Sequence, residues 1–301
     1  MRLRNKELRI ENCAKCNSRC TICTYSYMRR MKDVMAQEHF EKLVEQGINL
    51  GVDTVSVFGF GEPYIDPMLE DKIAYCSDRE LMTFVTTNAS ILSEDRAHKT
   101  LRAGLTHIRF SVHGLHDTYE KVHKGLKWKR TIENIDNFIR LNRDEYDNAC
   151  QTSVSVIPMH GEPIDEIRNF WEPNIGFLEI WKPHNWGASK KFRKLKDERK
   201  MTCGRPHNGP VQILADGRMI VCCFDYDAKM VVGDTYFDTI ENILKGERFN
   251  AIRKAHECYD KTGLLCENCD QLQDEDESPL LYSNRDETCE VGKTSSTKYK
   301  L

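Results

Sequence analysis

Residues 7–23, ELRIENCAKCNSRCTIC, begin as a short apolar strand and run directly into a loop that carries four cysteines. Further along the chain, short apolar runs alternate with segments whose apolar side chains are spaced three and four residues apart, as at residues 40–48 and 130–142. This alternation predicts an α/β fold with a parallel sheet. The expected strands lie at residues 7–10, 55–58, 83–86, 107–112, 154–157 and 176–180.

The composition narrows the class of protein. The chain has 301 residues, the size of one large domain or two modest ones, and its net charge of −3 argues against a protein that grips duplex nucleic acid on a basic face. Its start lacks an apolar signal segment, and no apolar run is long enough to span a membrane, so we expect a cytoplasmic protein without membrane contact. In that compartment, thirteen cysteines predict metal binding or redox chemistry rather than disulfides.

The first cysteine cluster lies directly after the first strand, at the end of a parallel sheet where ligands bind. Cys16, Cys20 and Cys23 have the spacing CxxxCxxC, which places three thiolates on one short loop. A [4Fe–4S] cluster held by three cysteines leaves one iron open for another ligand. The alternative is a closed zinc site with Cys13 as the fourth ligand.

This spacing, with the apolar Ile22 just before the third cysteine, resembles the signature of the radical S-adenosylmethionine (SAM) superfamily. The resemblance implies that residues 1–188 form a partial (β/α)6 TIM-like barrel. It also implies that the open iron binds SAM and that an external reductant such as flavodoxin or ferredoxin supplies one electron. SAM cleavage then yields methionine and a 5′-deoxyadenosyl radical. Cys13 lies outside the pattern, and we expect it not to be a ligand.

Polar residues after the next strands fit the same family. Gly59-Phe60-Gly61-Glu62-Pro63 is similar to the family's GGEP motif, with Phe60 in place of its first glycine. By that resemblance, Gly61 and Glu62 meet the SAM ammonium group. Asn88 and Ser111 end the third and fourth strands, where relatives contact the SAM carboxylate or ribose. Taken alone, each of these residues is equally typical of an ordinary turn.

A second set of cysteines follows residue 200: Cys203, Cys222, Cys266 and Cys269. Four soft ligands suit either zinc or a fully ligated iron–sulfur cluster. After the first motif, this set resembles the SPASM/Twitch extension of radical SAM enzymes, which implies an auxiliary [4Fe–4S] cluster in a small α+β domain. Glu275 and Pro279 stand where a full SPASM domain would have cysteines, so the shorter Twitch form with one cluster is expected. The Gly-x4-Cys spacing favours Cys222 over Cys223.

We therefore expect a barrel at residues 1–188, a basic linker at 189–202, a cluster domain at 203–275 and a disordered polar tail at 276–301. The predicted function is a radical SAM oxidation, either a dehydrogenation or a cross-link, of a peptide, sugar or nucleotide-like substrate. A redox-neutral isomerase or epimerase and a zinc-binding interaction module are the alternatives. Substrate contacts cannot be read from the sequence: His113, Glu179, His184 and Asn185 lie at strand ends and could face the cavity, but such residues are more often solvated loop residues.

Overall fold

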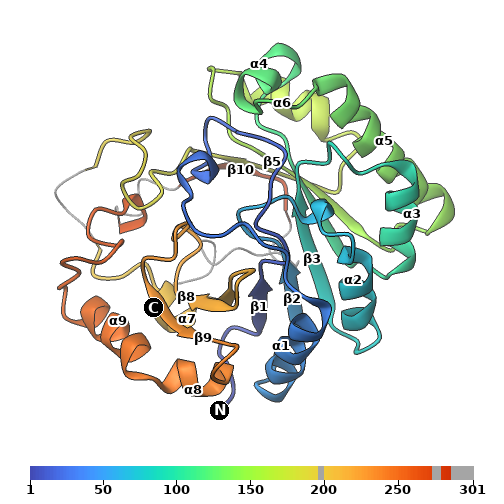
Figure 1. Ribbon diagram of the computed structural model, residues 1–301. Helices are drawn as coiled ribbons and strands as arrows, with labels where there is room; N and C mark the ends of the chain where they lie inside the picture. Colours follow the sequence, from blue (N-terminus) through green and yellow to red (C-terminus); the bar gives the residue numbers. More distant parts are fainter. Residues whose placement is uncertain (196–199, 273–278, 286–301) are drawn as a thin grey trace.

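The computed structural model describes residues 1–195, 200–272 and 279–285, and Figure 1 shows their arrangement. Six parallel strands form the centre of the fold, in the spatial order β6-β5-β4-β3-β2-β1. Each strand pairs with the next one along the chain, as expected for successive βα units. The strands are β1 (Glu7–Ile10), β2 (Thr54–Val57), β3 (Met82–Thr87), β4 (His107–Ser111), β5 (Gln151–Val156) and β6 (Phe177–Trp181).

Helices cover the outer face of these strands (Figure 1). They are α1 (Gln37–Asn49), α2 (Leu69–Ser77), α3 (Glu94–Arg102), α4 (His116–Val122), α5 (Trp128–Glu145) and α6 (Ile164–Trp171), with short 3-10 turns η1 (Tyr25–Tyr27) and η2 (Pro63–Ile65). Phe40 of α1 and Phe138 of α5 are fully buried in one apolar core with Leu8 and Ile10 of β1. The alternate residues of β1, Glu7 and Arg9, are paired with each other across 2.7 Å. Apolar side chains of the strands thus pack under the helices, and charged ones face the other way. This arrangement is the partial (β/α)6 barrel that was predicted.

The C-terminal unit continues the same sheet. It contains α7 (Arg205–Asn208), β7 (Val211–Ile213), β8 (Arg218–Ile220), β9 (Val231–Asp234), α8 (Ile240–Lys245), α9 (Glu247–Glu257) and η3 (Asp270–Leu272). Strand β7 pairs in parallel with β1, and β8 and β9 follow in antiparallel order. A left-handed glycine, Gly217 at φ 82°, makes the turn between β7 and β8. One ten-stranded sheet therefore runs through both parts of the chain.

The last described segment differs from the expected disordered tail. Strand β10 (Leu280–Ser283) pairs antiparallel with β6 and covers its free edge. The other residues of the expected tail, 276–278 and 286–301, lie outside the described residues. The described part of the expected linker, 189–195 and 200–202, contains turns and bends without helix or strand. Among the described residues, none of the helices combines the length and apolar character needed to cross a membrane.

Candidate functional site

The three N-terminal cysteines lie on the loop between β1 and α1. This loop is fastened to the end of α4, because the amides of Arg19 and Thr21 donate to the carbonyls of Lys124 and Val122 at 3.0 and 2.9 Å. The structure brings the predicted ligands Cys16, Cys20 and Cys23 together. Burial first, and then the negative charge of Glu62 and the proximity of the other two cysteines, raises the pKa of Cys16 to about 12.

The chemistry of this donor set suits an iron–sulfur cluster. Burial is also the main cause that raises the pKa of Cys20 to about 12 and that of Cys23 above its ordinary value. Buried thiols of this kind ionise only when a cationic group binds them, and soft sulfur ligands suit iron. A zinc ion would hold its sulfurs about 3.8 Å apart, given Zn–S bonds near 2.3 Å. Within the described residues, no three His, Cys, Asp or Glu side chains converge closely enough to hold one ion.

The contacts of Cys13 are those of a buried structural thiol, and its exclusion from the ligand set stays a prediction. It is fully buried, and its sulfur is within 3.3 Å of the amide of Lys15 and within 3.6 Å of the carbonyl of the same residue. Burial raises the pKa of this thiol to about 11. The Cys13 side chain therefore has a structural role in the bend that leads into the cluster loop.

The Gly-Phe-Gly-Glu-Pro loop after β2 packs directly on the cluster loop. A Cβ atom on Gly61 would stand 2.2 Å from the carbonyl oxygen of Cys13 and 2.5 Å from that of Lys15, so only glycine fits. The amide of Glu62 donates to the Lys15 carbonyl at 2.7 Å. Close backbone contact therefore fixes the position of the motif relative to the cysteines.

The Glu62 carboxylate connects this loop to the end of β3. It accepts hydrogen bonds from the Thr87 hydroxyl at 2.6 Å, the Asn88 amide at 2.8 Å and the Tyr64 amide at 3.2 Å. The side chain is only 2 % exposed, and burial raises the pKa of Glu62 to about 6 against the effect of these donors. The sequence indicated a charged contact for SAM. The structure shows in addition that this carboxylate joins the loop after β2 to the end of β3.

The other predicted SAM contacts lie at the same ends of the strands. The side-chain amide of Asn88 donates to Asn17 of the cluster loop at 2.9 Å. Ser111 is half buried at the end of β4, in register with Ser155 of β5. Ile22 packs with Val122, Ile157 and Trp181 in a small apolar cluster above the strand ends. The structure thus places Gly61, Glu62 and Asn88 against the cluster loop that carries Ile22, and Ser111 at the end of the neighbouring strand β4.

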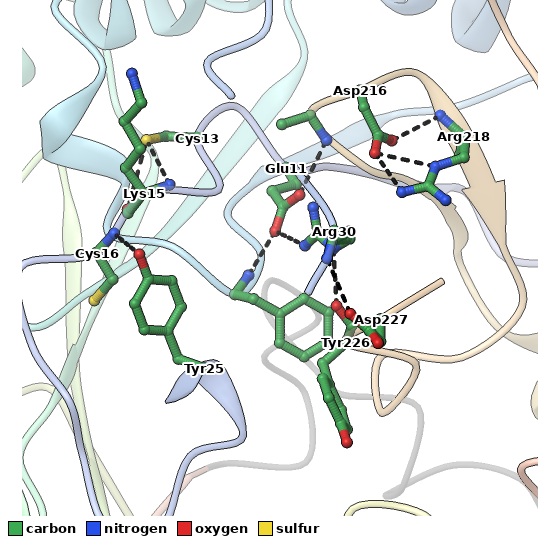
Figure 2. A network of polar contacts seen from close by, with 12 residues as sticks. Glu11, Cys13, Lys15, Cys16, Tyr25, Arg30, Asp216, Arg218, Tyr226 and Asp227 are labelled. Carbon is green, nitrogen blue, oxygen red and sulfur yellow. Dashed lines mark hydrogen bonds and ion pairs between the residues drawn. The ribbon is translucent and has the colours of Figure 1, made fainter. Parts of the chain in front are cut away.

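Sequence reasoning missed a buried carboxylate at the end of β1. Glu11 accepts hydrogen bonds from the Arg30 guanidinium at 2.7 Å, the Phe60 amide at 2.9 Å and the Ala215 amide at 3.0 Å. Figure 2 shows Glu11 between Arg30 of the cluster loop and the turn of the C-terminal hairpin. Arg30 also donates to the carbonyl of Tyr226 at 2.8 Å. The partners of Glu11 come from three separate segments, so no local motif could have revealed this residue.

The four C-terminal cysteines also come together. The pKa of Cys266 is raised to about 12, mainly by burial and next by Cys203. Burial likewise raises the pKa of Cys269, with Cys203 and Cys266 among the further causes. Cys222 is close enough to Cys269 to interact with it electrostatically. The second predicted ligand set therefore forms one buried group of sulfurs.

An arginine that the sequence did not single out lies against this group. Arg205 donates to the sulfur of Cys222 at 3.2 Å and to that of Cys223 at 2.8 Å. The choice between Cys222 and Cys223 as ligand stays a prediction, and the electrostatic interaction of Cys222 with Cys269 favours Cys222. Cys258 is exposed at the end of α9, and Cys289 lies outside the described residues.

Charged and polar side chains fill the inner side of the strands. Glu179 of β6 pairs with Arg109 of β4 at 2.8 Å and with Arg285 beyond β10 at 3.7 Å. Asn185 is buried and bonded to Asp270 and Arg193, which indicates a structural role rather than a place in a cavity. His184 is half buried beside Phe224 of the C-terminal unit, 5.1 Å between ring centres.

These features define a barrel enzyme with two separate cysteine sites on one sheet. Residues 13–172 match the family model of the radical SAM superfamily, and residues 203–270 match that of an iron–sulfur cluster-binding domain called SPASM. The chain belongs to the radical SAM superfamily. SAM and [4Fe–4S] clusters, including an auxiliary one, are the cofactors that these domains imply, and a zinc-binding interaction module is not supported.

Curated relatives of this chain include proteins named as cyclases and as a synthase. The GTP 3′,8-cyclase of Aquifex aeolicus (strain VF5) is 34 % identical over 199 residues, 62 % of this chain and 60 % of the relative. The enzyme of the same name from Alkaliphilus metalliredigens (strain QYMF) is 25 % identical over 168 residues, 54 % of this chain and 50 % of the relative. The chain spans about half the length of the curated relatives it matches.

Solved structures resemble the fold over nearly the whole chain. BtrN in complex with AdoMet and 2-DOIA has a TM-score of 0.65 at 18 % identity, covering 90 % of this chain and 94 % of that one. Streptococcus suis SuiB bound to the precursor peptide SuiA has a TM-score of 0.69 at 15 % identity, covering 89 % and 70 %. At these identities the likeness shows the fold alone.

Proposed function

We propose that this chain cleaves SAM reductively and oxidises a substrate, by dehydrogenation or by forming a cross-link. When bound, SAM and its reduced cluster supply the 5′-deoxyadenosyl radical that takes a hydrogen atom from the substrate, and the auxiliary cluster takes up the second electron. This assignment makes the enzyme a radical SAM oxidoreductase.

One observation supports the oxidation most directly, namely the position of the second sulfur group beside the barrel. The pKa of Cys223 is lowered, first by a hydrogen bond from Cys222 and then by the positive charges of Arg205 and Arg9. Arg9 belongs to β1 and is 9 % exposed on the inner side of the sheet. The charge of Arg9 thus reaches Cys223 from the inner side of β1, which supports a place for the second sulfur group near the barrel interior, where a substrate radical would form.

The chain's own residues would bind and orient the cofactors. Cys16, Cys20 and Cys23 would hold the SAM-binding cluster, and Cys203, Cys222, Cys266 and Cys269 the auxiliary one. Gly61 lets the loop after β2 pack against the backbone of the cluster loop, and the Glu62 carboxylate would complement the SAM ammonium. The apolar cluster around Ile22 would exclude water from the adenosyl group. Asn88 and Ser111 would supply polar contacts at the same ends of the strands.

The names of the relatives and the class of chemistry indicate the kind of substrate and the kind of electron donor. The relatives' names point to a nucleotide, as for the GTP cyclases, or a peptide, as for SuiB, and a sugar remains a candidate from the sequence. A flavodoxin or ferredoxin would reduce the SAM-binding cluster. We place the enzyme in the cytoplasm, where thiols stay reduced.

Anaerobic reconstitution with iron and sulfide tests this proposal. We expect about eight irons per chain and the formation of 5′-deoxyadenosine on reduction with SAM. The variant with Cys16, Cys20 and Cys23 all replaced by Ala should lose this product. Cys266→Ala should keep SAM cleavage but lose substrate turnover, with Cys258→Ala as a matched control. SAM cleavage that survives in the triple variant would overturn the proposal.

Product mass separates oxidation from a redox-neutral isomerisation or epimerisation. Substrates for the screen are purine nucleotides, peptides and sugars. An oxidised product lacks two hydrogens, since one hydrogen atom leaves with 5′-deoxyadenosine and one electron and one proton leave separately. A product of unchanged mass would exclude the oxidation and leave the isomerase assignment.

A further inference from the structure

A histidine that belongs to no recognised motif touches one of the predicted cluster ligands. His123 follows α4, is 1 % exposed, and its Nδ1 atom lies 3.3 Å from the sulfur of Cys20. The two residues are 103 positions apart in the chain. The contact therefore depends on the fold, which fastens the cluster loop to the end of α4.

Backbone hydrogen bonds determine which nitrogen of this ring carries the proton. The amide N–H of His113 donates to Nε2 of His123 at 2.9 Å, so Nε2 is an acceptor and carries no hydrogen. The ring is then neutral with its single hydrogen on Nδ1, the atom that faces Cys20. Nδ1–H must be the donor, and the sulfur of Cys20 the acceptor.

The neighbouring rings keep His123 in this orientation. It stacks between Tyr119 and His113, with ring centres 4.3 and 5.1 Å away. The Tyr119 hydroxyl is 2.9 Å from that of Thr131, and the amide of Ile157 donates to Nδ1 of His113 at 3.1 Å. The donor is thus held by packing and by bonds to the ends of two strands.

Ser18 also contacts Cys20, but it does not replace this donor. Its hydroxyl is 3.1 Å from the sulfur and donates to the carbonyl of Lys124 at 3.2 Å. A hydroxyl has one hydrogen, so these two acceptors compete for it. The hydrogen on His123 Nδ1 has no such competing acceptor among the contacts of that atom described above.

We propose that His123 is a positioning residue that orients Cys20 and, through an N–H···S hydrogen bond, raises the reduction potential of the SAM-binding cluster. The inference rests on the proposed function, because it takes Cys20 to be a cluster ligand. A hydrogen bond to a ligating sulfur draws electron density from it and favours the reduced cluster, and outer partners of ligands commonly act in this way. The bond therefore lowers the demand placed on the external reductant.

The potential of the SAM-binding cluster tests this role in the reconstituted enzyme. His123→Phe keeps a flat ring for the stack but removes both ring nitrogens, and we expect its cluster to titrate at a lower potential by electron paramagnetic resonance. His123→Asn keeps a short N–H donor and should recover part of the loss. His98→Phe, at a half-buried side chain of α3 that contacts Tyr146, is the control and should match the wild type. An unchanged potential in His123→Phe with full iron content overturns the inference.

The position of the hydrogen on the His123 ring provides a second test, which needs no variant reconstituted with a cluster. In the full-length chain, nitrogen NMR of the His123 ring should show the hydrogen on Nδ1, and a hydrogen on Nε2 overturns the inference. Failure of the proposed function looks different. In that case Cys20→Ala would leave the iron content and the formation of 5′-deoxyadenosine unchanged, whatever the state of His123.

Discussion

At the scale of single residues, Gly61 has the tightest steric requirement near the predicted SAM site. Gly61→Ala would press a methyl group against the carbonyl oxygens of Cys13 and Lys15, and neither backbone segment can move without shifting the cluster loop. We expect a loss of about 1–3 kcal/mol in the free energy of unfolding and weaker SAM binding. Urea denaturation and equilibrium dialysis with SAM measure the two effects.

The control for that variant is Gly246→Ala, where φ is −66° and the nearest atom to the new Cβ is 3.1 Å away. It should keep SAM binding and lose little stability. Equal losses in both variants would show that the contact with the cluster loop is not what requires glycine at position 61.

A pH dependence follows from the buried Glu62. Its pKa rises from 4.5 to about 6, mainly through burial, so the folded chain holds a proton that the unfolded chain releases earlier. The stability that this proton contributes is present below pH 4.5 and is lost as the pH rises through about 6. Relative to Glu62→Gln, the wild type should lose up to about 2 kcal/mol across this range.

Urea denaturation of both chains without SAM, at several pH values up to roughly 7.5, checks this prediction. The other ionisable groups are common to both chains and cancel in the difference. The free energy of unfolding of the wild type relative to Glu62→Gln should fall as the pH rises. A constant difference across the range, or one that increases with pH, contradicts a raised pKa at Glu62.

The cysteine spacing and the glycine motif could be predicted at this scale because each is a local pattern. Glu11, His123 and Arg205 could not be predicted, because their roles come from contacts with distant segments. Glu11, for example, accepts a hydrogen bond from an amide 204 positions away. A charged residue at the end of a strand is common enough that nothing in the sequence marks it out.

At the scale of elements, the Glu11–Arg30 pair holds the cluster loop, the loop after β2 and the C-terminal hairpin together. Both side chains are 2 % exposed. Glu11→Leu would leave the Arg30 charge buried without its carboxylate, and we expect a loss of about 3–5 kcal/mol in the free energy of unfolding. The double variant with Arg30→Met should lose less free energy of unfolding than the sum of the two single variants, because each single change leaves the other partner buried without its counter-charge. Urea denaturation of the four chains gives the coupling.

The exposed pair of Arg79 and Glu45 is the matched control, since its side chains are 33 % and 50 % exposed. Arg79→Met should cost less than about 1 kcal/mol. If Glu11→Leu costs no more than this, the network does not hold the elements together.

The six strands of the barrel and helices α1 and α5 were predictable because their apolar patterns are regular. Strands β9 and β10 were not predicted. The β10 sequence, Leu280–Ser283, is short and lies between polar residues, and it becomes a strand by pairing with β6, about a hundred positions earlier. Pairing at this distance leaves no periodic signal in a four-residue segment.

At the scale of the whole molecule, charge is unevenly distributed. The chain carries −3 overall, but residues 12–32, which contain the cluster loop, include five basic residues and no acidic one. Met31 and Tyr27 on the same loop are 69 % and 50 % exposed. A basic surface with exposed apolar side chains beside the cluster loop suits transient contact with an acidic electron carrier.

We therefore expect reduction by flavodoxin or ferredoxin to slow as salt rises, because ions screen such contacts over about 10 Å at 0.1 M. Arg29→Glu and Met31→Glu should slow this reaction several-fold and leave reduction by photoreduced deazaflavin unchanged. Stopped-flow absorbance of the cluster measures both rates. Phe237→Glu, at a side chain 89 % exposed on the C-terminal unit, is the control. A rate with the carrier that is insensitive to salt and to both variants contradicts this docking surface.

The parallel pairing of β7 with β1 has a mechanical consequence. A hinge between the barrel and the C-terminal unit would have to break the hydrogen-bonded ladder of a continuous sheet. The strands from which the cluster loop and the C-terminal hairpin extend are thereby held in fixed register. Adaptation to a substrate then falls to the loops above the strand ends, while the scaffold between the two redox sites stays rigid.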